Sequence, residues 1–204
     1  MPRIRSFIDA GERKIGHFND GDAVLEFVNS NKLETLAALG TSCPDHFLRT
    51  KIRPIIIDLD PANPNLEAVI EGLSDAFAAY REDYQSYYER CKRDNSPAIR
   101  DPNPVIYLIP GVGMLSFAKD KATARIAGEF YVNAINVMRG SDTVSTYMGL
   151  DEQEAFDIEY WLLEEAKLQR MPKPKSLAGR VAVVTGGAGG RVNAVFTPQV
   201  EGTP

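Results

Sequence analysis

The chain has 204 residues, of which 44% are hydrophobic and 25% charged, and its formal net charge at pH 7 is -5. A chain of this size can bury a core of its own, and its acidic balance argues against nucleic-acid binding, which requires a basic surface. Its two cysteines are too few for a disulfide framework or a cysteine metal site, and no apolar run is long enough for a membrane span or typical of a secretory signal. We therefore expect a cytoplasmic protein without a metal centre.

The first predicted elements follow an N-terminal arm, residues 1–13, which is polar and poorly periodic. Residues 14–18 fit a short strand. Helices are expected over 22–28 and 33–39, and Gly40 is placed to end the second of them as a C-terminal cap.

A polar loop over residues 41–46 contains Cys43, Asp45 and His46. These residue types occur in catalytic and zinc sites. Zinc, however, requires four ligands, or three and a water molecule, and closeness in sequence does not pair a cysteine nucleophile with a histidine. Turn and cap chemistry is the better supported interpretation of this loop.

Residues 54–58, Pro-Ile-Ile-Ile-Asp, form an apolar run typical of a buried parallel strand. Asp58 and Asp60 would stand at its carboxyl end, the edge at which open α/β sheets bind ligands. Either aspartate would suit a sugar hydroxyl or a metal ion. The alternative, which we favour, is that both cap the proline-rich turn 61–64.

A long helix is expected over residues 65–91, because apolar residues keep helical spacing for about seven turns. Its second half carries a tyrosine cluster. Packing is a better explanation for these rings than a stacking platform for bases or sugars. A loop over residues 90–104 separates this helix from the next strand.

The central unit is a strand over 104–109, a glycine turn, and a helix over 120–139. Strand, glycine turn and helix in this order are typical of parallel α/β sheets. The helix has a buried stripe of alanines and larger apolar residues.

The glycine turn is also a candidate phosphate site. Gly111 and Gly113 let the backbone approach a ligand closely, and Lys119 lies near the next helix start, where amides attract anions. The turn lacks the third glycine of the dinucleotide fingerprint and the ending of a P-loop. A glycine turn that binds nothing remains the alternative.

An edge strand is expected over residues 143–148. Asp151 and Glu154 form a capping-box pattern before a further helix. The acidic residues of that helix, Glu159 among them, are expected to lie on a solvated face. The apolar residues of that helix are Phe156, Ile158, Trp161, Leu162, Leu163 and Ala166.

Residues 171–179 form a linker with two prolines, and residues 180–204 begin with a buried-strand run and a glycine loop. Thr185, Gly186 and Gly190 resemble the Thr-Gly-x-x-x-Gly-x-Gly opening of a short-chain dehydrogenase. In that family the loop wraps the pyrophosphate of NAD(P). Val192 stands where the last glycine belongs, so we expect a truncated or altered dehydrogenase start.

The larger part of the chain, about residues 14–190, resembles the region before this junction in bifunctional rhamnulose-1-phosphate aldolase/alcohol dehydrogenases. In that family a class II aldolase domain with a histidine-bound zinc comes first, and a short-chain dehydrogenase acting on lactaldehyde comes last. The matching segments are 22–28, 40–46, 50–51, 106–114, 137–140 and 159–161. The chain's only histidines, His17 and His46, do not supply the aldolase metal motif.

We therefore predict a three-layer α/β domain over residues 14–170, with a mainly parallel, Rossmann-like sheet and helices on both faces. The leading hypothesis is a connecting domain of a sugar-phosphate aldolase/dehydrogenase, without catalytic residues of its own. The alternatives are a module binding a phosphorylated small molecule at Gly111, Gly113, Lys119 and Asp58, and an NAD(P)-dependent oxidoreductase. A homo-oligomer is compatible with each of them.

Overall fold

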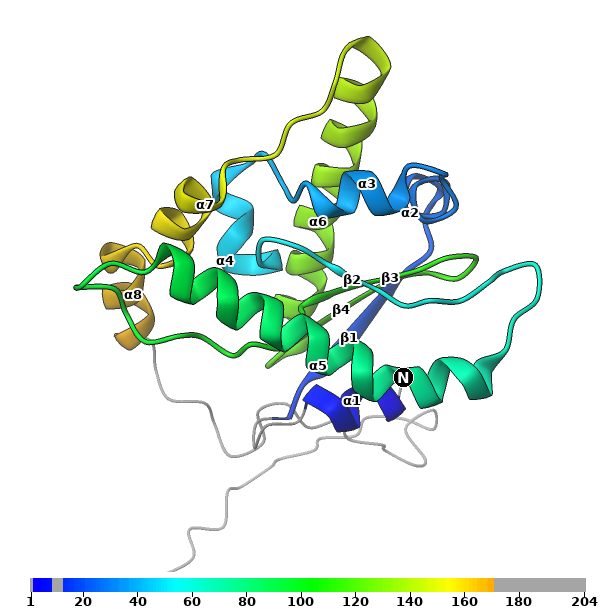
Figure 1. The fold of residues 1–204 in the computed structure, drawn as a ribbon, viewed down its shortest axis with the longest axis horizontal. Coiled ribbons are helices and arrows are strands. Elements are labelled where there is room, and N and C mark those ends of the chain that lie inside the picture. The colour runs from blue at the N-terminus through cyan, green and yellow to red at the C-terminus, as the bar shows by residue number, and fades with distance from the viewer. Residues whose placement is uncertain (1, 9–12, 171–204) are drawn as a thin grey trace, which may run out of the picture.

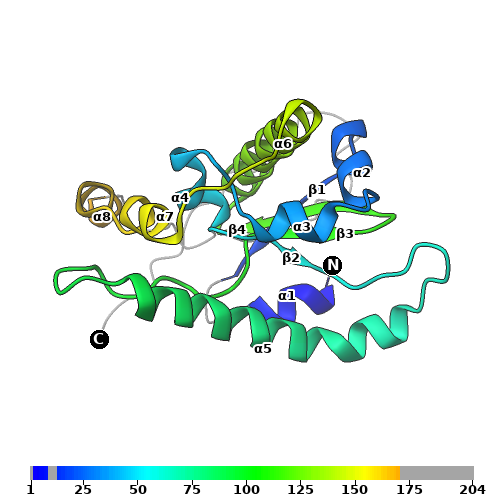
Figure 2. The same cartoon turned by 45° about the horizontal axis from the view of Figure 1, so that its top comes forward.

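A four-stranded sheet with helices on both faces forms the centre of the protein (Figure 1). The computed structural model describes residues 2–8 and 13–170. Figure 2 shows the three layers, with α1 and α5 on one side of the sheet and α2, α3 and α6 on the other. The sheet has the order β1-β4-β3-β2, in which the strands are β1 (Ile15–Asn19), β2 (Ile55–Ile56), β3 (Ile106–Ile109) and β4 (Gly113–Ala118).

The sheet is mostly antiparallel. β4 runs antiparallel to both β1 and β3, and only the short pair of β2 with β3 is parallel. The predicted three-layer α/β arrangement is thus confirmed, whereas the mainly parallel, Rossmann-like sheet is wrong.

The error arises at the glycine turn, which closes a β-hairpin and does not lead into a helix. Ile109 pairs with Gly113 across the turn, and the Val112 amide donates to the Ile109 carbonyl (3.0 Å). Gly111 and Gly113 have φ of 72° and 133°, which side chains rarely adopt. Residues 114–117 are buried throughout, so β4 lacks the alternation of buried and exposed residues that is typical of an antiparallel strand.

On one face of the sheet lie α2 (Asp22–Val28), α3 (Leu33–Ala38) and α6 (Lys121–Val144). Asp120 caps α6 at the predicted start, accepting from the Thr123 amide (2.7 Å). The alternate side chains of β3, Ile106 and Leu108, point to this face. The buried residues of α6 are Ala124, Ala127, Gly128, Tyr131, Ala134, Ile135 and Met138.

On the other face lie α1 (Pro2–Ile8) and the long α5 (Leu66–Cys91), which begins at the predicted cap Asn65. Tyr107 of β3 points to this face and packs with Phe77 of α5. Ile4 and Ile8 of α1 are buried here too, so this part of the expected arm belongs to the core.

A third cluster lies beyond the sheet, at the C-terminal end of α5. It brings together α4 (Phe47–Thr50), which follows the short 3₁₀ helix Pro44–His46, and α7 (Glu152–Glu159). Asp151 caps α7, accepting from the Gln153 amide (2.9 Å). α8 (Leu162–Gln169) follows and buries none of its side chains. No helix in the described part of the chain is long and apolar enough to cross a membrane.

The edge strand predicted over 143–148 is absent, because α6 continues to Val144 and an irregular segment follows. None of the residues 139–144 at the end of α6 is buried, and Figure 1 shows this end projecting from the body. The side chains at 143–146 are exposed and find no neighbouring strand.

The irregular segment runs beside the segment that precedes the 41–46 loop. The Tyr147 hydroxyl donates to the Gly40 carbonyl (2.8 Å), and the Leu150 amide donates to the Thr41 carbonyl (3.3 Å). A Cβ at Gly149 would lie 1.9 Å from the Leu39 carbonyl oxygen. Glycine is therefore the residue that lets these two segments meet.

Two buried tyrosines give a matched test of core polarity. The Tyr131 hydroxyl is buried without a hydrogen-bond partner among the described residues, whereas that of Tyr147 is bonded. Because a buried unpaired hydroxyl costs about 1 kcal/mol or more, Tyr131→Phe should raise the free energy of unfolding by about 1 kcal/mol, measured by urea denaturation. Tyr147→Phe should lower it by a similar amount. Equal effects of the two substitutions would contradict this assignment.

Candidate functional site

The residues of the predicted phosphate site do not gather in one place. Gly111 and Gly113 lie at the tip of the β3–β4 hairpin, and Lys119 lies just beyond the far end of β4. Six residues of strand separate Gly113 from Lys119, about 20 Å. The glycines serve close packing: a Cβ at Gly111 would lie 2.5 Å from Pro61, and one at Gly113 would lie 2.7 Å from the Asn19 carbonyl oxygen.

Asp58 and Asp60 are exposed beyond the end of β2, where they line a cavity of about 440 Å³ with Asn63 and Asn65. Asp60 accepts from the Ala62 amide (2.8 Å), which is the predicted turn contact. Asp58 accepts no corresponding hydrogen bond from the residues that the structure describes. Thr185, Gly186 and Gly190 lie outside the described residues.

The polar loop 41–46 is a folded structural unit. His46 is buried, and its Nδ1 lies 2.9 Å from the Thr41 hydroxyl oxygen. Burial lowers the pKa of His46, and Asp45 opposes this shift only in part. No set of three or more histidine, cysteine, aspartate and glutamate side chains is placed to hold a metal ion within the described residues.

The strongest candidate site is a cavity of about 340 Å³ between α4, the end of β4 and the loop before β3, which we call the Lys51 cavity. Its walls combine apolar and charged groups. The apolar residues include Phe47, Val105 and Phe117, and the charged residues are Lys14, Arg49, Lys51, Arg100, Asp101, Lys119 and Glu159. Such mixed concave sites are typical of small-molecule binding.

Lys51 has the least ordinary backbone in the protein. Its φ and ψ are 62° and 177°, a region that is almost exclusive to glycine and costs a side chain about 1–3 kcal/mol. It is the only non-glycine residue with a positive φ in the described ranges. This conformation directs the side chain inward, where the ammonium donates to the Asp101 carbonyl and lies 3.5 Å from the centre of the Tyr84 ring.

Glu159, the last residue of α7, is the buried carboxylate of the same cavity. Its oxygens accept from the Tyr84 hydroxyl (2.7 Å) and the Tyr87 hydroxyl (3.3 Å). Burial raises the pKa of Glu159, and the Lys51 charge partly opposes this rise. The predicted solvated position of Glu159 is wrong. The tyrosine cluster packs as predicted. The hydroxyls of Tyr84 and Tyr87 bind this carboxylate, and those of Tyr80 and Tyr88 donate to backbone carbonyls.

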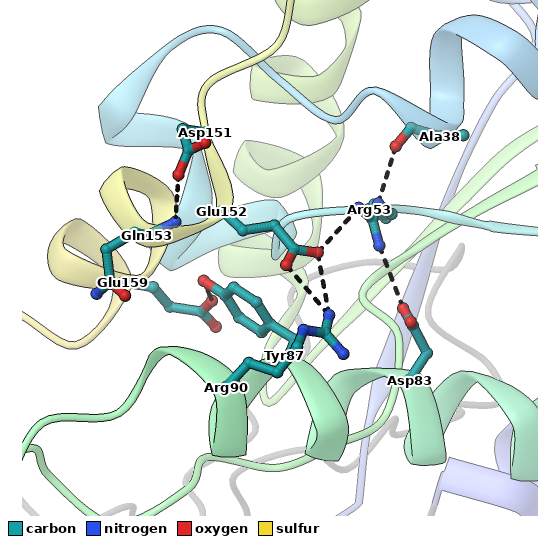
Figure 3. A network of polar contacts seen from close by, with 9 residues as sticks. All are labelled: Ala38, Arg53, Asp83, Tyr87, Arg90, Asp151, Glu152, Gln153 and Glu159. Atoms are coloured by element: carbon teal, nitrogen blue, oxygen red, sulfur yellow. Dashed lines mark hydrogen bonds and ion pairs between the residues drawn. The ribbon is translucent and has the colours of Figure 1, made fainter.

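A surface network fixes α7, and with it Glu159, against α5. The Glu152 carboxylate lies between Arg53 and Arg90, at 3.1 Å from each guanidinium, and Arg53 also contacts Asp83 (3.4 Å). Figure 3 shows this network beside Glu159, which lies about two helical turns from Glu152 on the same face of α7. Each exposed pair contributes little, but together they hold three segments in register.

Lys51 gives the stability of the protein a distinctive pH dependence. Burial lowers its pKa from 10.5 to about 8. Between these values the unfolded chain keeps the proton that the folded chain has lost, so the folded state gains stability as pH rises. We expect the free energy of unfolding of the wild type to rise between pH 8 and 10 relative to that of Lys51→Met, measured by urea denaturation. Parallel curves would contradict this shift. Both proteins contain the same tyrosines, so the contribution of tyrosine ionisation to the pH dependence cancels in the comparison.

Sequence reasoning missed both Lys51 and Glu159. A lone lysine in a loop carries no periodic signal, and Glu159 lies among acidic residues that are mostly exposed. Two signals were available. The tyrosine hydroxyls require partners once the rings are buried, and the segments 50–51 and 159–161, which contain both residues, match the related family.

Two comparisons with known proteins found similarity to the chain. A family model described as the second domain of class II aldolase matches residues 1–168. The chain is 35% identical over 190 residues to a Bacillus subtilis (strain 168) protein named "Uncharacterized oxidoreductase YuxG", an alignment that covers 93% of the chain and 27% of that protein. The chain thus spans about a quarter of the length of this curated relative. No solved structure matches it.

Proposed function

The chain belongs to the family of class II aldolase second domains, and from this membership we propose that it is the connecting domain of a bifunctional sugar-phosphate aldolase/short-chain dehydrogenase. Rhamnulose 1-phosphate is the proposed substrate of the aldolase, and NAD(P) is the proposed cofactor of the dehydrogenase. The domain would orient the two enzymes and carry neither active site.

The relative supports this proposal in two ways. It is named an oxidoreductase, and the alignment covers 27% of its length, which leaves room for further domains in that protein. The sequence 180–190 of the present chain resembles the start of a short-chain dehydrogenase. A second domain of an aldolase followed by such a start is the arrangement expected of a connecting domain.

The observation that carries the connecting role is the exposed apolar surface of α8 and its preceding residue. Trp161, Leu162 and Leu163 are exposed at 50%, 51% and 59%. α8 ends at Gln169, directly before the linker 171–179. The proposed occupant of this surface is therefore the dehydrogenase domain that follows the linker.

The histidines also agree with a role that is not catalytic. His46 is held by Thr41, and His17 on β1 lies 3.0 Å from the Lys121 ammonium. Burial and this neighbouring charge lower the pKa of His17. Since the chain contains only these two histidines, the zinc motif of the aldolase would come from another domain.

The test uses Trp161, the only tryptophan of the chain, as a reporter. The chain labelled with fluorotryptophan would be mixed with a separately produced dehydrogenase domain of the bifunctional family. We expect the fluorine NMR signal of Trp161 to shift on mixing, and Leu163→Asp to abolish the shift. Val144→Asp, at an exposed residue of α6, should leave it unchanged and serves as the control.

The same material tests catalysis. The chain alone should neither cleave rhamnulose 1-phosphate nor oxidise or reduce a nicotinamide cofactor. Turnover of either substrate by the chain alone, or an unchanged Trp161 signal, would contradict the connecting role.

A second candidate function is the binding of a phosphorylated small molecule at the hairpin turn. The separation of Lys119 from Gly111 and Gly113 weakens this candidate, because no other basic side chain lines the neighbouring Asp58 cavity. Basic side chains gather instead at the Lys51 cavity.

A further inference from the structure

We propose that the Lys51 cavity binds a small organic anion, with a phosphate or carboxylate group held by its basic side chains and a short carbon skeleton against its apolar wall. This site is independent of the connecting role.

The charge of the cavity is the first argument. Five basic and two acidic side chains line it, although the chain as a whole carries a net charge of -5. Lys14 pairs with Asp101 (3.3 Å) and Arg100 pairs with Glu165 (3.1 Å). Lys51 faces the Glu159 carboxylate and offsets its charge, so the positive excess lies on the two cations of the rim.

Those rim cations are Arg49 and Lys119, which come from different elements of the fold. Arg49 belongs to α4 and Lys119 follows β4. Both side chains are exposed, and neither forms an ion pair or hydrogen bond with any other described residue. Two unpaired cations facing one cavity favour an anionic occupant, because charge-assisted hydrogen bonds to phosphate and carboxylate are the strong ones.

The other cavities of similar size lack this excess. A cavity of about 460 Å³ between α2 and α6 contains two basic and two acidic side chains. Its lysine pairs with Asp142 (2.6 Å), and its arginine pairs with Glu26. The Asp58 cavity contains two aspartates and no basic residue. The positive excess is thus specific to the Lys51 cavity among these three.

The lysine inside the cavity is fixed in position before any ligand binds. Lys51 is buried and held by the Asp101 carbonyl and the Tyr84 ring, on a backbone that is strained for a side chain. Strain of this kind is found where a side chain must be fixed for binding. A fixed ammonium loses little entropy when a ligand arrives.

The apolar wall argues for an organic molecule over a free inorganic ion. Phe47, Val105 and Phe117 line the cavity together with the cations. A volume of about 340 Å³ lies at the lower end of the range for small-molecule sites. It suits a compound of a few carbon atoms.

The experiment compares ligands that share one carbon skeleton, using calorimetric titration of the purified 204-residue chain. Glycerol is the neutral compound, glycerol 3-phosphate carries a phosphate, and glycerate carries a carboxylate. We expect no binding of glycerol and measurable binding of at least one of the two anions. The tighter anion identifies which group the site prefers. Binding of neither anion would overturn the proposal.

Variants then locate the site. Arg49→Ala and Lys119→Ala should each raise the dissociation constant of the anion by about tenfold or more, the usual effect of losing a hydrogen bond to a charged group. Both residues are exposed, so the variants should keep the wild-type melting curve. Lys167→Ala, at an exposed lysine of α8 outside the cavity, is the control and should bind as the wild type does.

Two results would overturn the proposal. Unchanged affinity in both rim variants would place the anion elsewhere on the protein. Inorganic phosphate that binds as tightly as glycerol 3-phosphate would show that the carbon skeleton makes no contact, and that the ligand is not organic.

Discussion

Lys51→Met is expected to lower the free energy of unfolding by about 3 kcal/mol at neutral pH, measured by urea denaturation. The Glu159 carboxylate is buried, and Lys51 provides the largest favourable charge acting on it. Removal of one member of a buried charge pair leaves the other without compensation, which costs about 3–5 kcal/mol. The loss should become smaller as the pH falls, because burial raises the pKa of Glu159 and the carboxylate then takes up a proton.

The control is the double variant Lys51→Met/Glu159→Gln. Glutamine keeps acceptor and donor atoms near Tyr84 and Tyr87 without the charge, so this protein should regain at least half of the lost stability. A coupling free energy near zero in this double-mutant cycle would show that the two charges do not interact.

Gly149→Ala is the second substitution with a large expected effect, a loss of about 3 kcal/mol in the free energy of unfolding, measured by thermal and urea denaturation. The added methyl group would meet the Leu39 carbonyl oxygen at 1.9 Å. Backbone atoms cannot rotate away as a side chain can, so the two segments must separate. The hydrogen bonds of Tyr147 to Gly40 and of Leu150 to Thr41 would weaken with them.

Gly72→Ala is the matched control for this substitution. Gly72 lies within α5, and a Cβ there would meet no atom within 4 Å. Alanine should therefore raise the free energy of unfolding by about 0.5–1 kcal/mol. A similar loss in both variants would mean that glycine flexibility, and not the close approach at Gly149, determines the effect.

The helices were predictable because their signals are local. α5 and α6 keep helical spacing over many turns, and their caps Asn65 and Asp120 accept from the amides three residues on, as expected. The sheet was less predictable. A fully buried strand loses its alternation, and a glycine turn looks the same before a helix as within a hairpin. The direction of β4 depends on contacts that the local sequence does not encode.

The candidate site depends even more than the sheet on contacts between residues that are far apart in the sequence. Lys51 and Glu159 are separated by about half of the chain, and they meet because α4, α5 and α7 pack into one buried cluster. The family resemblance described the chain as an intermediate domain without a complete active site. It gave no indication of a cavity within that domain.

Because its C-terminal end projects from the body of the protein, α6 has two parts whose backbone hydrogen bonds should open at different rates. From Ala124 to Met138 the helix is anchored by buried side chains. Beyond Met138 it is held by its own backbone hydrogen bonds and by surface ion pairs such as that of Asp142 with Lys32. Such turns open without unfolding the rest of the protein. Amide hydrogens at residues 140–144 should therefore exchange with solvent deuterium long before those of Ala127 to Ile135, and proteolytic nicking should begin there.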